Sequence, residues 1–567
     1  MTSNADLVKF PAMEENKIEK IKTFLTYIFS IFIISIIITE IILGILPPTA
    51  VDALNHHLAI PKLWLKNGGF YEIKWAVFSY YPMNVDLLYL IPLYFHNDII
   101  PNFIHLGFGL ATAWLIYSYL NHNFGRIPGL LGVFIFLSTP IIMRMSTVAY
   151  VDLGLVFFTT ASIMAFLQWR NSGYKGNKWL FISAIAMGLA LGTKYNALIA
   201  WFFVSLSIVF LYSRDTAKQW LAIKYGAIFF LVSLLVFSPW LIKNLILTGN
   251  PFFPLFKGIF NPDSNTIASA GTYSIVSGDT NVGLFKTRAI MYGENFWETL
   301  LIPFRFFFQG QDYSDRYFDG VLNPILIVLV PFAFMKKSLH DHKLFFVLFS
   351  VFFILAAFFL DQIRTRYILP VIPILSILTV MGLINILNWT ILLSIRWRNV
   401  LAVLVLSAFI GIMSKNIVYI KNYYQSIAPM SYISGKESRD EFISHHDHSY
   451  AAMKYINEFT SKKAKIRLIF LAQNGYYLER AYEDDPTFGM DVIRSFAAST
   501  IDDKTFQDHI NAFGYTHFLV RVDLFNQFLQ NNYSSDAREL LLRRMSKAMD
   551  IIYNKNGYLI YKIIHDS

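Results

Sequence analysis

Six ionisable residues stand at the ends of apolar segments, where a charge is unfavourable unless it has a partner or water. They are two acids and four bases: Asp52, Asp152, Lys194, Lys243, Arg364 and Arg366. The acids begin or follow different apolar segments at one predicted membrane level, so they can converge over one cavity. A bound anion would explain the cations, and phosphate is the natural candidate because arginine offers paired donors and lysine a point charge.

Each of these residues also has a simpler interpretation. Asp52 and Asp152 are both placed where an aspartate often caps the first turn of a helix. Lys194 can extend along apolar surface to place its ammonium group in water. The cations can instead form interior salt bridges with Asp52, Asp152 and Asp361, in which case no anion is needed.

Histidines and other motifs are less informative. The pairs His56-His57 and His340-Asp341-His342, and the run 445–448, contain metal-ligand residue types without a fixed ligand spacing. The chain has no cysteine, which excludes disulfides, thiolate metal sites and cysteine nucleophiles. We find no Walker loop, dinucleotide fingerprint, nucleophile elbow or zincin helix, so ATP-driven transport has no support.

The composition is that of a membrane protein. Of 567 residues, 55% are apolar and only 15% are charged, whereas a globular chain carries about a quarter charged residues. The formal net charge of +10 could suggest nucleic acid. In a membrane protein, however, the first question is which side of the bilayer the Lys and Arg residues occupy.

Apolar runs predict about eleven spanning helices, since a span needs about 20 mostly apolar residues. The segments are 23–46, 100–120, 127–144, 152–169, two within 178–212, 221–239, 321–335, 344–360, 367–389 and 399–415. Basic residues gather in alternate short loops, which places the N-terminus in the cytoplasm. The apolar stretch 83–95 is too short to span and is expected to be a re-entrant or surface helix.

The predicted fold class is therefore a polytopic α-helical membrane protein with a small C-terminal α/β domain. We expect a transmembrane catalytic domain over 1–415, with outer loops at about 47–99 and 240–320, a linker over 416–448 and an extracytoplasmic domain over 449–567. Within that domain the pattern predicts a helix at 450–459 and strands at 466–471, 516–522 and 558–564. The part 258–283 is typical of a mobile loop.

The order of several short motifs resembles the GT-C glycosyltransferases. In chain order these are Asp52, Tyr81-Pro82, Ala-Tyr-Val before Asp152, Gly192-Thr193-Lys194-Tyr195, Pro-Trp-Leu-Ile-Lys-Asn ending at Asn244, Gly249-Asn250-Pro251, and Arg366-Tyr367 with Pro370 and Pro373. Within that superfamily the chain resembles a bacterial branch that includes the lipid A aminoarabinose transferase and relatives of the protein O-mannosyltransferases. The resemblance covers about residues 20–420.

The resemblance implies a role for each candidate residue. Asp52 would be the general base or would position the acceptor, and Asp152 would orient an active-site group. The implied substrate-binding residues are His56, His57, Tyr81, Lys194, Tyr195, Lys243, Arg364, Arg366 and Tyr367, the four cations among them gripping the lipid phosphate. Some relatives have adjacent acids in the first loop, whereas Ala53 follows Asp52 here. A divalent metal, Mg or Mn at Asp52 and Asp152, is therefore left open.

The predicted function is an integral-membrane, inverting glycosyltransferase that uses a polyprenyl-phosphate-linked donor. It would transfer a hexosyl or pentosyl group to a lipid, glycan or protein acceptor on the outer face of a bacterial cytoplasmic membrane. No nucleic-acid partner is expected. One alternative is a transporter or flippase of an anionic lipid-linked sugar, although we see no internal repeat of the kind common in transporters. Another is a non-catalytic assembly or sensor protein.

Overall fold

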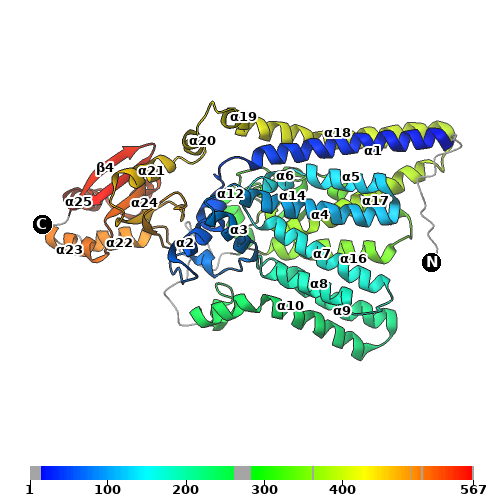
Figure 1. The fold of residues 1–567 in the computed structure, drawn as a ribbon, viewed down its shortest axis with the longest axis horizontal. Helices are drawn as coiled ribbons and strands as arrows, with labels where there is room; N and C mark the ends of the chain where they lie inside the picture. Colours follow the sequence, from blue (N-terminus) through cyan, green and yellow to red (C-terminus); the bar gives the residue numbers. More distant parts are fainter. Residues whose placement is uncertain (1–14, 261–282, 361–362, 486, 500–501, 565–567) are drawn as a thin grey trace.

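The computed structural model describes residues 15–260, 283–360, 363–485, 487–499 and 502–564. Figure 1 shows a long helical bundle with a small mixed α/β domain at one end, beside the C-terminus. We call that end of the bundle the domain end. Most of the loop predicted at 258–283 lies outside the described residues.

The bundle is built from long apolar helices. They are α1 (Glu15–Gly44), α4 (Ile100–Phe124), α5 (Arg126–Ser138), α6 (Pro140–Ser146), α7 (Asp152–Asn171), α8 (Lys178–Leu191), α9 (Ala197–Thr216), α10 (Gln219–Thr248), α15 (Ile325–Val328), η3 (Pro331–Met335), α16 (His340–Phe358), η4 (Thr365–Val371), α17 (Ile372–Thr390) and α18 (Ile395–Ile427). Among the described residues, eight helices are long and apolar enough to cross a bilayer, and α5 with α6, bent by 71°, makes a ninth. Two shorter apolar helices, Lys178–Leu191 and Ile325–Met335, occupy the remaining predicted segments.

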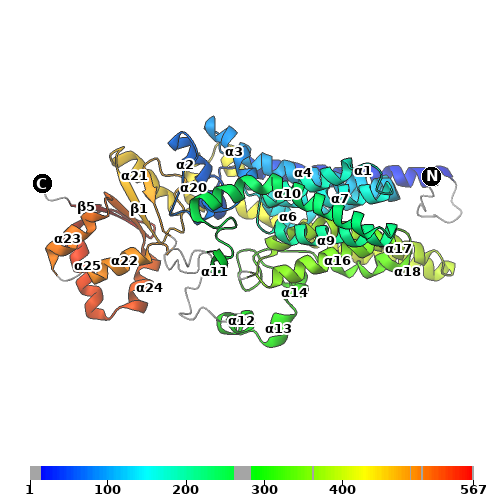
Figure 2. The same ribbon diagram turned by 90° about the horizontal axis from the view of Figure 1, so that it is seen from below.

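Shorter elements collect at the domain end. They are the π-helix η1 (Ala53–His57), α2 (Ala59–Asn67), η2 (Val77–Tyr80), α3 (Asn84–Tyr94), α11 (Lys257–Phe260), α12 (Leu284–Tyr292), α13 (Phe296–Leu300) and α14 (Ile302–Gln309). The stretch expected to form a re-entrant or surface helix at 83–95 is α3, whose 11 residues are too few to span. In Figure 2, α12 and α13 project sideways from the bundle at this end.

Two short helices, α19 (Pro429–Ile433) and α20 (Arg439–His446), connect α18 to the C-terminal domain. The domain contains α21 (Tyr450–Phe459), β1 (Lys465–Ile469), β2 (Ala481–Glu483), α22 (Met490–Ala498), α23 (Asp503–Ala512), β3 (His517–Arg521), α24 (Val522–Asn532), α25 (Ser535–Ala548), β4 (Met549–Lys555) and β5 (Tyr558–Ile563). Its sheet has the order β2-β1-β3-β5-β4. β1 runs parallel to β2 and β3, whereas β5 is antiparallel to β3 and β4.

Apolar residues on both faces of this sheet are buried. Ile466 and Leu468 pack toward α21, while Ile469 and Val520 pack toward α22, α24 and α25. Between β4 and β5, Asn556 and Gly557 both have positive φ, at 55° and 81°. An Asn-Gly pair with two left-handed residues is the turn that best matches the twist of a two-residue hairpin.

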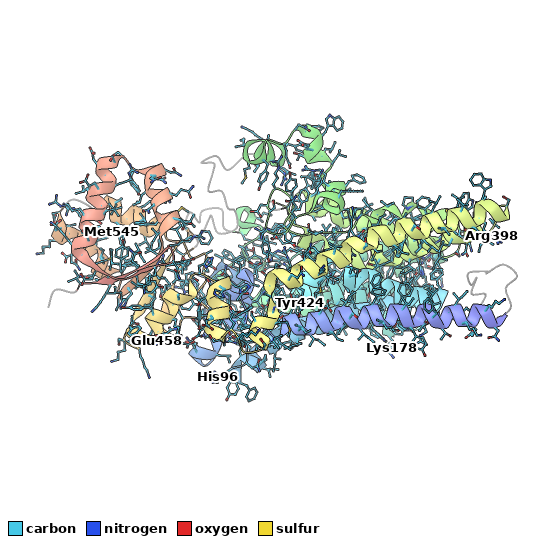
Figure 3. All side chains as sticks on the ribbon, turned by 90° about the horizontal axis from the view of Figure 1, so that it is seen from above. His96, Lys178, Arg398, Tyr424, Glu458 and Met545 are labelled. Atoms are coloured by element: carbon cyan, nitrogen blue, oxygen red, sulfur yellow. The ribbon has the colours of Figure 1, made fainter. Side chains whose placement is uncertain are left out.

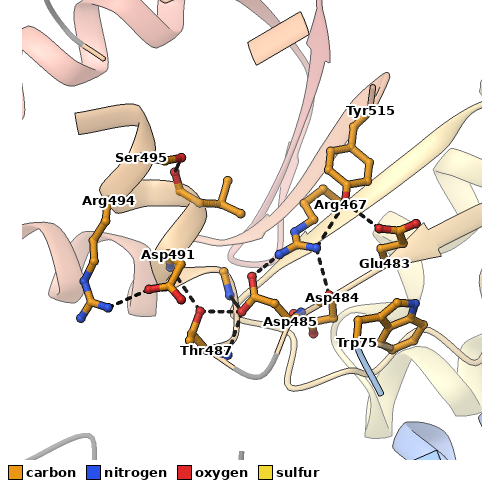
Figure 4. A network of polar contacts seen from close by, with 12 residues as sticks. Trp75, Arg467, Glu483, Asp484, Asp485, Thr487, Asp491, Arg494, Ser495 and Tyr515 are labelled. Carbon is orange, nitrogen blue, oxygen red and sulfur yellow. Dashed lines mark hydrogen bonds and ion pairs between the residues drawn. The ribbon is translucent and has the colours of Figure 1, made fainter. Parts of the chain in front are cut away.

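The loop from β2 to α22 carries a polar network (Figure 4). Arg467 on β1 forms an ion pair with Asp485 and donates to the carbonyl of Asp484 at 2.9 Å. The fully buried Asp484 carboxylate accepts the backbone N–H of Gln473 at 2.8 Å. Asp485 accepts from the hydroxyl of Thr487 at 2.5 Å, which fixes the entry to α22.

The C-terminal domain and the helices leading to it are docked onto the loop between α1 and α4. Lys62 Nζ lies 2.7 Å from Glu479 Oε1, and Arg439 lies 2.6 Å from Asp98. The ring of Trp75 lies 5.4 Å from that of Tyr482 on β2. One side of this loop therefore belongs to the domain interface, while its continuation, η2, runs back toward the bundle.

Candidate active site

Asp52 lies in the segment between α1 and η1, and Pro47-Pro48 in this segment prevent the helix from continuing. Its side chain makes no cap hydrogen bond to η1, so the capping interpretation is wrong. Its carboxylate instead pairs with the guanidinium of Arg366, on η4. The Asp52 backbone N–H donates to the hydroxyl of Tyr150 at 3.3 Å. Asp52 is thereby tied to two distant segments.

The positive charge of Arg366 keeps the carboxyl group of Asp52 ionised. Burial is the largest influence and alone would raise the pKa of Asp52, but the guanidinium of Arg366 and the neighbouring His56 outweigh it. The pKa is held well below its usual range because the ion pair favours the charged form. While Arg366 remains in place, Asp52 is an anion and a weak base.

Asp152 is the first residue of α7 and makes the second ion pair. Its Oδ1 lies 2.8 Å from Lys194 Nζ, and only 1% of the residue is exposed. Its other oxygen has no hydrogen-bond partner among the described residues. Lys194 lies in the break between α8 and α9, so it reaches Asp152 rather than extending to water. Breaking such a buried pair is strongly destabilising.

Aromatic rings join the two ion pairs. Lys194 Nζ and the Arg366 guanidinium each lie 5.5 Å from the ring of Tyr367. The Arg366 guanidinium also lies 5.8 Å from the ring of Tyr150. These distances are within the range of cation–π attraction. The result is one charged cluster built from the loop after α1, the loop before α7, the α8–α9 break and η4.

The two predicted histidines are beside this cluster. His57 Nδ1 lies 2.7 Å from Asp86 Oδ1, with both residues buried, and the rings of His56 and His57 are 4.1 Å apart. Burial lowers the pKa of each histidine to about 3 and raises the pKa of Asp86 to about 7. Because burial disfavours isolated charge, the His57–Asp86 pair carries no net charge between about pH 3 and pH 7.

Sequence reasoning missed Asp86, Tyr150 and His105. His105 Nε2 accepts the backbone N–H of Leu153 at 2.9 Å, so its Nδ1 carries the proton and donates to the carbonyls of Met145 and Val148. That histidine therefore fixes the loop that carries Tyr150 and Asp152. The sequence feature that could have identified such residues is a polar side chain in an otherwise apolar segment.

Tyr81, Tyr195 and Lys243 form a neighbouring group. The two tyrosine rings lie 5.3 Å apart, and the Tyr195 hydroxyl donates to the carbonyl of Phe253 at 3.0 Å. Lys243 Nζ donates to the carbonyl of Ser79 at 2.7 Å and lies 4.6 Å from the ring of Trp240. No carboxylate pairs with Lys243 within the described part of the chain.

Arg364 belongs to a separate network. It lies 3.2 Å from Asp315 and 3.9 Å from Asp319, and Asp319 also binds Arg144 at 2.9 Å. Salt bridges thus account for three of the four predicted cations. Lys194 and Arg366 pair with predicted acids, whereas Arg364 pairs with Asp315 and Asp319, which were not named as partners. Asp361, named as a possible partner, lies outside the described residues.

The predicted metal pair is not arranged as a ligand set. Asp52 and Asp152 each face a cation, and over the described ranges no three His, Asp or Glu side chains form a group that could hold a metal ion. The residues present therefore do not fit a metal at these positions.

Comparison with known proteins identifies a family and solved structures that this chain resembles. The family described as dolichyl-phosphate-mannose-protein mannosyltransferase matches residues 99–242. The structure is similar to that of ArnT from Cupriavidus metallidurans bound to undecaprenyl phosphate, with 14% identity, a TM-score of 0.54, and coverage of 94% of this chain and 97% of the other. The archaeal oligosaccharyltransferase AglB from Archaeoglobus fulgidus, in complex with an inhibitory peptide and a dolichol-phosphate, has 12% identity and a TM-score of 0.51, covering 95% and 74%.

This chain has the GT-C fold. The similarity extends over nearly the whole chain, including the C-terminal domain, so the GT-C fold expected from the motif order is confirmed. No curated protein sequence matches this chain. The mannosyltransferase match covers Asp152 and Lys194 and leaves out Asp52 and Arg366. One ion pair, Asp152–Lys194, therefore lies within the matched segment, and the other, Asp52–Arg366, lies wholly outside it.

Proposed function

We propose that this protein is an integral-membrane glycosyltransferase that moves a sugar from a polyprenyl-phosphate-linked donor to an acceptor at the domain end. The observation that best supports this proposal is that the Asp52–Arg366 and Asp152–Lys194 pairs meet at the ring of Tyr367. A carboxylate near the acceptor and cations near a departing phosphate are what this reaction requires. The GT-C fold supports the same assignment.

The reaction is a single displacement at the anomeric carbon. The acceptor atom attacks that carbon, and the bond from the carbon to the phosphate oxygen breaks with its electrons staying on polyprenyl phosphate. The acceptor proton passes to Asp52. Because phosphate is already a good leaving group, no general acid is needed, and one displacement inverts the anomeric configuration.

Donor binding would make Asp52 a stronger base. When the donor phosphate engages Arg366, it competes with Asp52 for the same guanidinium. Losing that cation raises the pKa of Asp52 toward its ordinary value, which makes the carboxylate a better proton acceptor. Lys194 would exchange Asp152 for phosphate in the same way, with Lys243 adding a third positive charge. Before the donor binds, Asp52 and Asp152 neutralise the charges of Arg366 and Lys194.

The aromatic residues complete the proposed site. Tyr81, Tyr195 and Tyr367 offer ring faces and hydroxyls of the kind that bind sugars. His56 and His57 lie on η1 directly after Asp52 and would contact the acceptor side. Arg364, held by Asp315, would contact the outer part of the phosphate.

The domain end is proposed to face the outside of a bacterial cytoplasmic membrane. Arg398 and Lys178 are at the opposite end of the bundle (Figure 3), where Arg170 and Arg214 also gather around Asp215 and Asp341. Basic loops remain in the cytoplasm. Nucleotide sugars are absent outside, which explains a lipid-linked donor. The same proposal assigns 1–415 to catalysis, 416–448 to a linker and 449–567 to an extracytoplasmic domain.

The test is to incubate the purified protein with a panel of polyprenyl-phosphate hexoses and pentoses. We expect release of polyprenyl phosphate and sugar transfer for at least one donor when a suitable acceptor is supplied. A transporter or flippase would instead relocate a labelled lipid-linked sugar in proteoliposomes without cleaving its sugar–phosphate bond. Relocation without cleavage across the panel would overturn the proposal.

A further inference from the structure

Residues 283–309 form an arm that leaves the bundle at the domain end. It consists of α12, α13 and α14, and it projects to one side in two views (Figures 2 and 3). The base of the arm is attached through α14, which packs on α16. Phe285 also contacts Phe358 of α16, with ring centroids 6.4 Å apart. The arm is thus continuous with the side of the spanning helices.

Three charged groups of the arm, Arg288, Glu294 and Arg305, are turned inward, whereas Lys286 is exposed. Arg288 Nε lies 2.6 Å from Glu294 Oε2, and Arg305 lies 2.9 Å from the other oxygen of the same carboxylate. Only 5% of Arg288 and 3% of Glu294 is exposed. Arg288 also donates to the carbonyl of Arg316 at 2.7 Å, and both guanidiniums lie 5.4 Å from the ring of Phe318. The internal side of the arm is therefore polar and satisfied.

The outward side of the arm is apolar. It presents Ile290, Phe296, Trp297, Leu301, Phe304 and Phe308, of which Trp297 is 66% and Phe304 61% exposed. Soluble proteins place charges outside and aromatic residues inside, because burying apolar surface is favourable by about 25 cal/mol per Å². This arm has the reverse arrangement. Its outward side consequently belongs in apolar surroundings.

Lipid provides those surroundings. On the adjoining α16, Leu348 and Leu355 are also exposed, at 51% and 46%, as is Phe359 directly after the helix, at 76%. This helix is apolar and long enough to cross the bilayer. The exposed side of the arm extends that surface laterally at the level where the bundle ends. Tryptophan and phenylalanine are favoured at this depth of a membrane.

We propose that residues 283–309 are an interfacial arm whose Trp297 and Phe304 side chains insert into the leaflet at the domain end. The arm enlarges the contact between protein and bilayer beside the segment that carries Arg364 and Arg366. Phe318 connects the two regions, because its ring contacts both arm arginines and its carbonyl accepts the backbone N–H of Thr365 at 2.6 Å. This inference requires only that the bundle lies in a membrane, so it stands independently of the catalytic proposal.

The chain has no cysteine, so single labels can be introduced without background. Trp297→Cys and Phe304→Cys would be labelled with an environment-sensitive nitrobenzoxadiazole fluorophore and placed in phosphatidylcholine nanodiscs. Nitroxides near the lipid ester linkage or near the chain terminus report depth, and iodide reports water. Matched controls are Leu231→Cys on the span α10 and Leu540→Cys on α25 of the C-terminal domain, both exposed leucines.

We expect both arm labels to lose iodide quenching and to be quenched more by the shallow nitroxide than by the deep one. The label at 231 should respond more strongly to the deep nitroxide, and the label at 540 only to iodide. Iodide quenching of the arm labels equal to that at 540 would refute the inference. Protection from both iodide and nitroxides would also refute it, since a protein surface, such as a second copy, would then cover the arm.

Discussion

The charged cluster at the domain end and the polar network of the C-terminal domain are built in opposite ways. Asp52 and Arg366 are 314 residues apart in the chain, and Asp152 and Lys194 are 42 apart. In the C-terminal domain Arg467 and Asp485 are only 18 apart, and their neighbours shape one loop (Figure 4). Local pairs stabilise a turn, whereas pairs between remote segments gather reactive groups that the local fold does not require. The comparison predicts losses of activity in the first region and of stability in the second.

The largest effect is expected from Asp52→Asn. This change keeps the side-chain volume and removes the proposed base, so kcat for sugar transfer should fall by about 10²- to 10⁴-fold. The matched control is Asp315→Asn, which also removes a carboxylate paired with an arginine but should leave kcat close to that of the wild type. Equal rates for Asp52→Asn and the wild type, with both correctly inserted, would remove Asp52 from the mechanism.

The C-terminal domain should lose stability as the pH rises. Burial raises the pKa of Asp484 to about 7, so the folded state binds a proton that the unfolded state releases near pH 4. The stability that Asp484 contributes is therefore full below about pH 4, falls by up to about 4 kcal/mol between about pH 4 and pH 7, and is constant above that range. This loss of stability can be measured by hydrogen exchange at β1 and β3 in the full chain, after correction for intrinsic exchange rates. The Asp484→Asn protein should show no such slope, and an unchanged slope would assign it to another group.

Arg366→Ala should weaken donor binding by about 1.5–3 kcal/mol, or roughly 10- to 150-fold, if a charged hydrogen bond to phosphate is lost. Arg364→Ala is the matched comparison. Because Arg364 is held by Asp315 and Asp319, it should affect donor affinity less. Binding of a labelled polyprenyl phosphate to both variants decides the order. A larger loss from Arg364→Ala would move the phosphate site away from Asp52.

The smallest effect is expected where the two regions meet. Glu479→Gln removes the carboxylate that Lys62 and Lys66 contact at 2.7 and 3.1 Å. An exposed pair of this kind contributes about 0.2–1 kcal/mol, so hydrogen exchange in α2 should speed up by less than about five-fold. A much larger increase would mean that the domain is docked mainly by this carboxylate.

The sequence predicts the bundle well because hydropathy acts locally. The predicted helix at 450–459 and the strands near 466, 516 and 558 appear as α21, β1, β3 and β5 within one or two residues. Asp52 and Asp152 were also recognisable, since each is an acid beside an apolar run. Which cation each acid pairs with was not, because the pairing of Asp52 with Arg366 rather than with Arg364 depends on how η4 is turned. Arg364 and Arg366 are two residues apart and enter different networks for the same reason.

The loop that contacts both regions links them mechanically. Trp75 lies against Tyr482 of the sheet, and Ser79, a little further along the same loop, holds the ammonium group of Lys243 through its carbonyl. A tilt of the C-terminal domain would therefore pull on this loop and shift the positive charge of Lys243 near the tyrosines that are proposed to bind the sugar. An acceptor bound by the C-terminal domain would thus change the electrostatics of the proposed active site without contacting it.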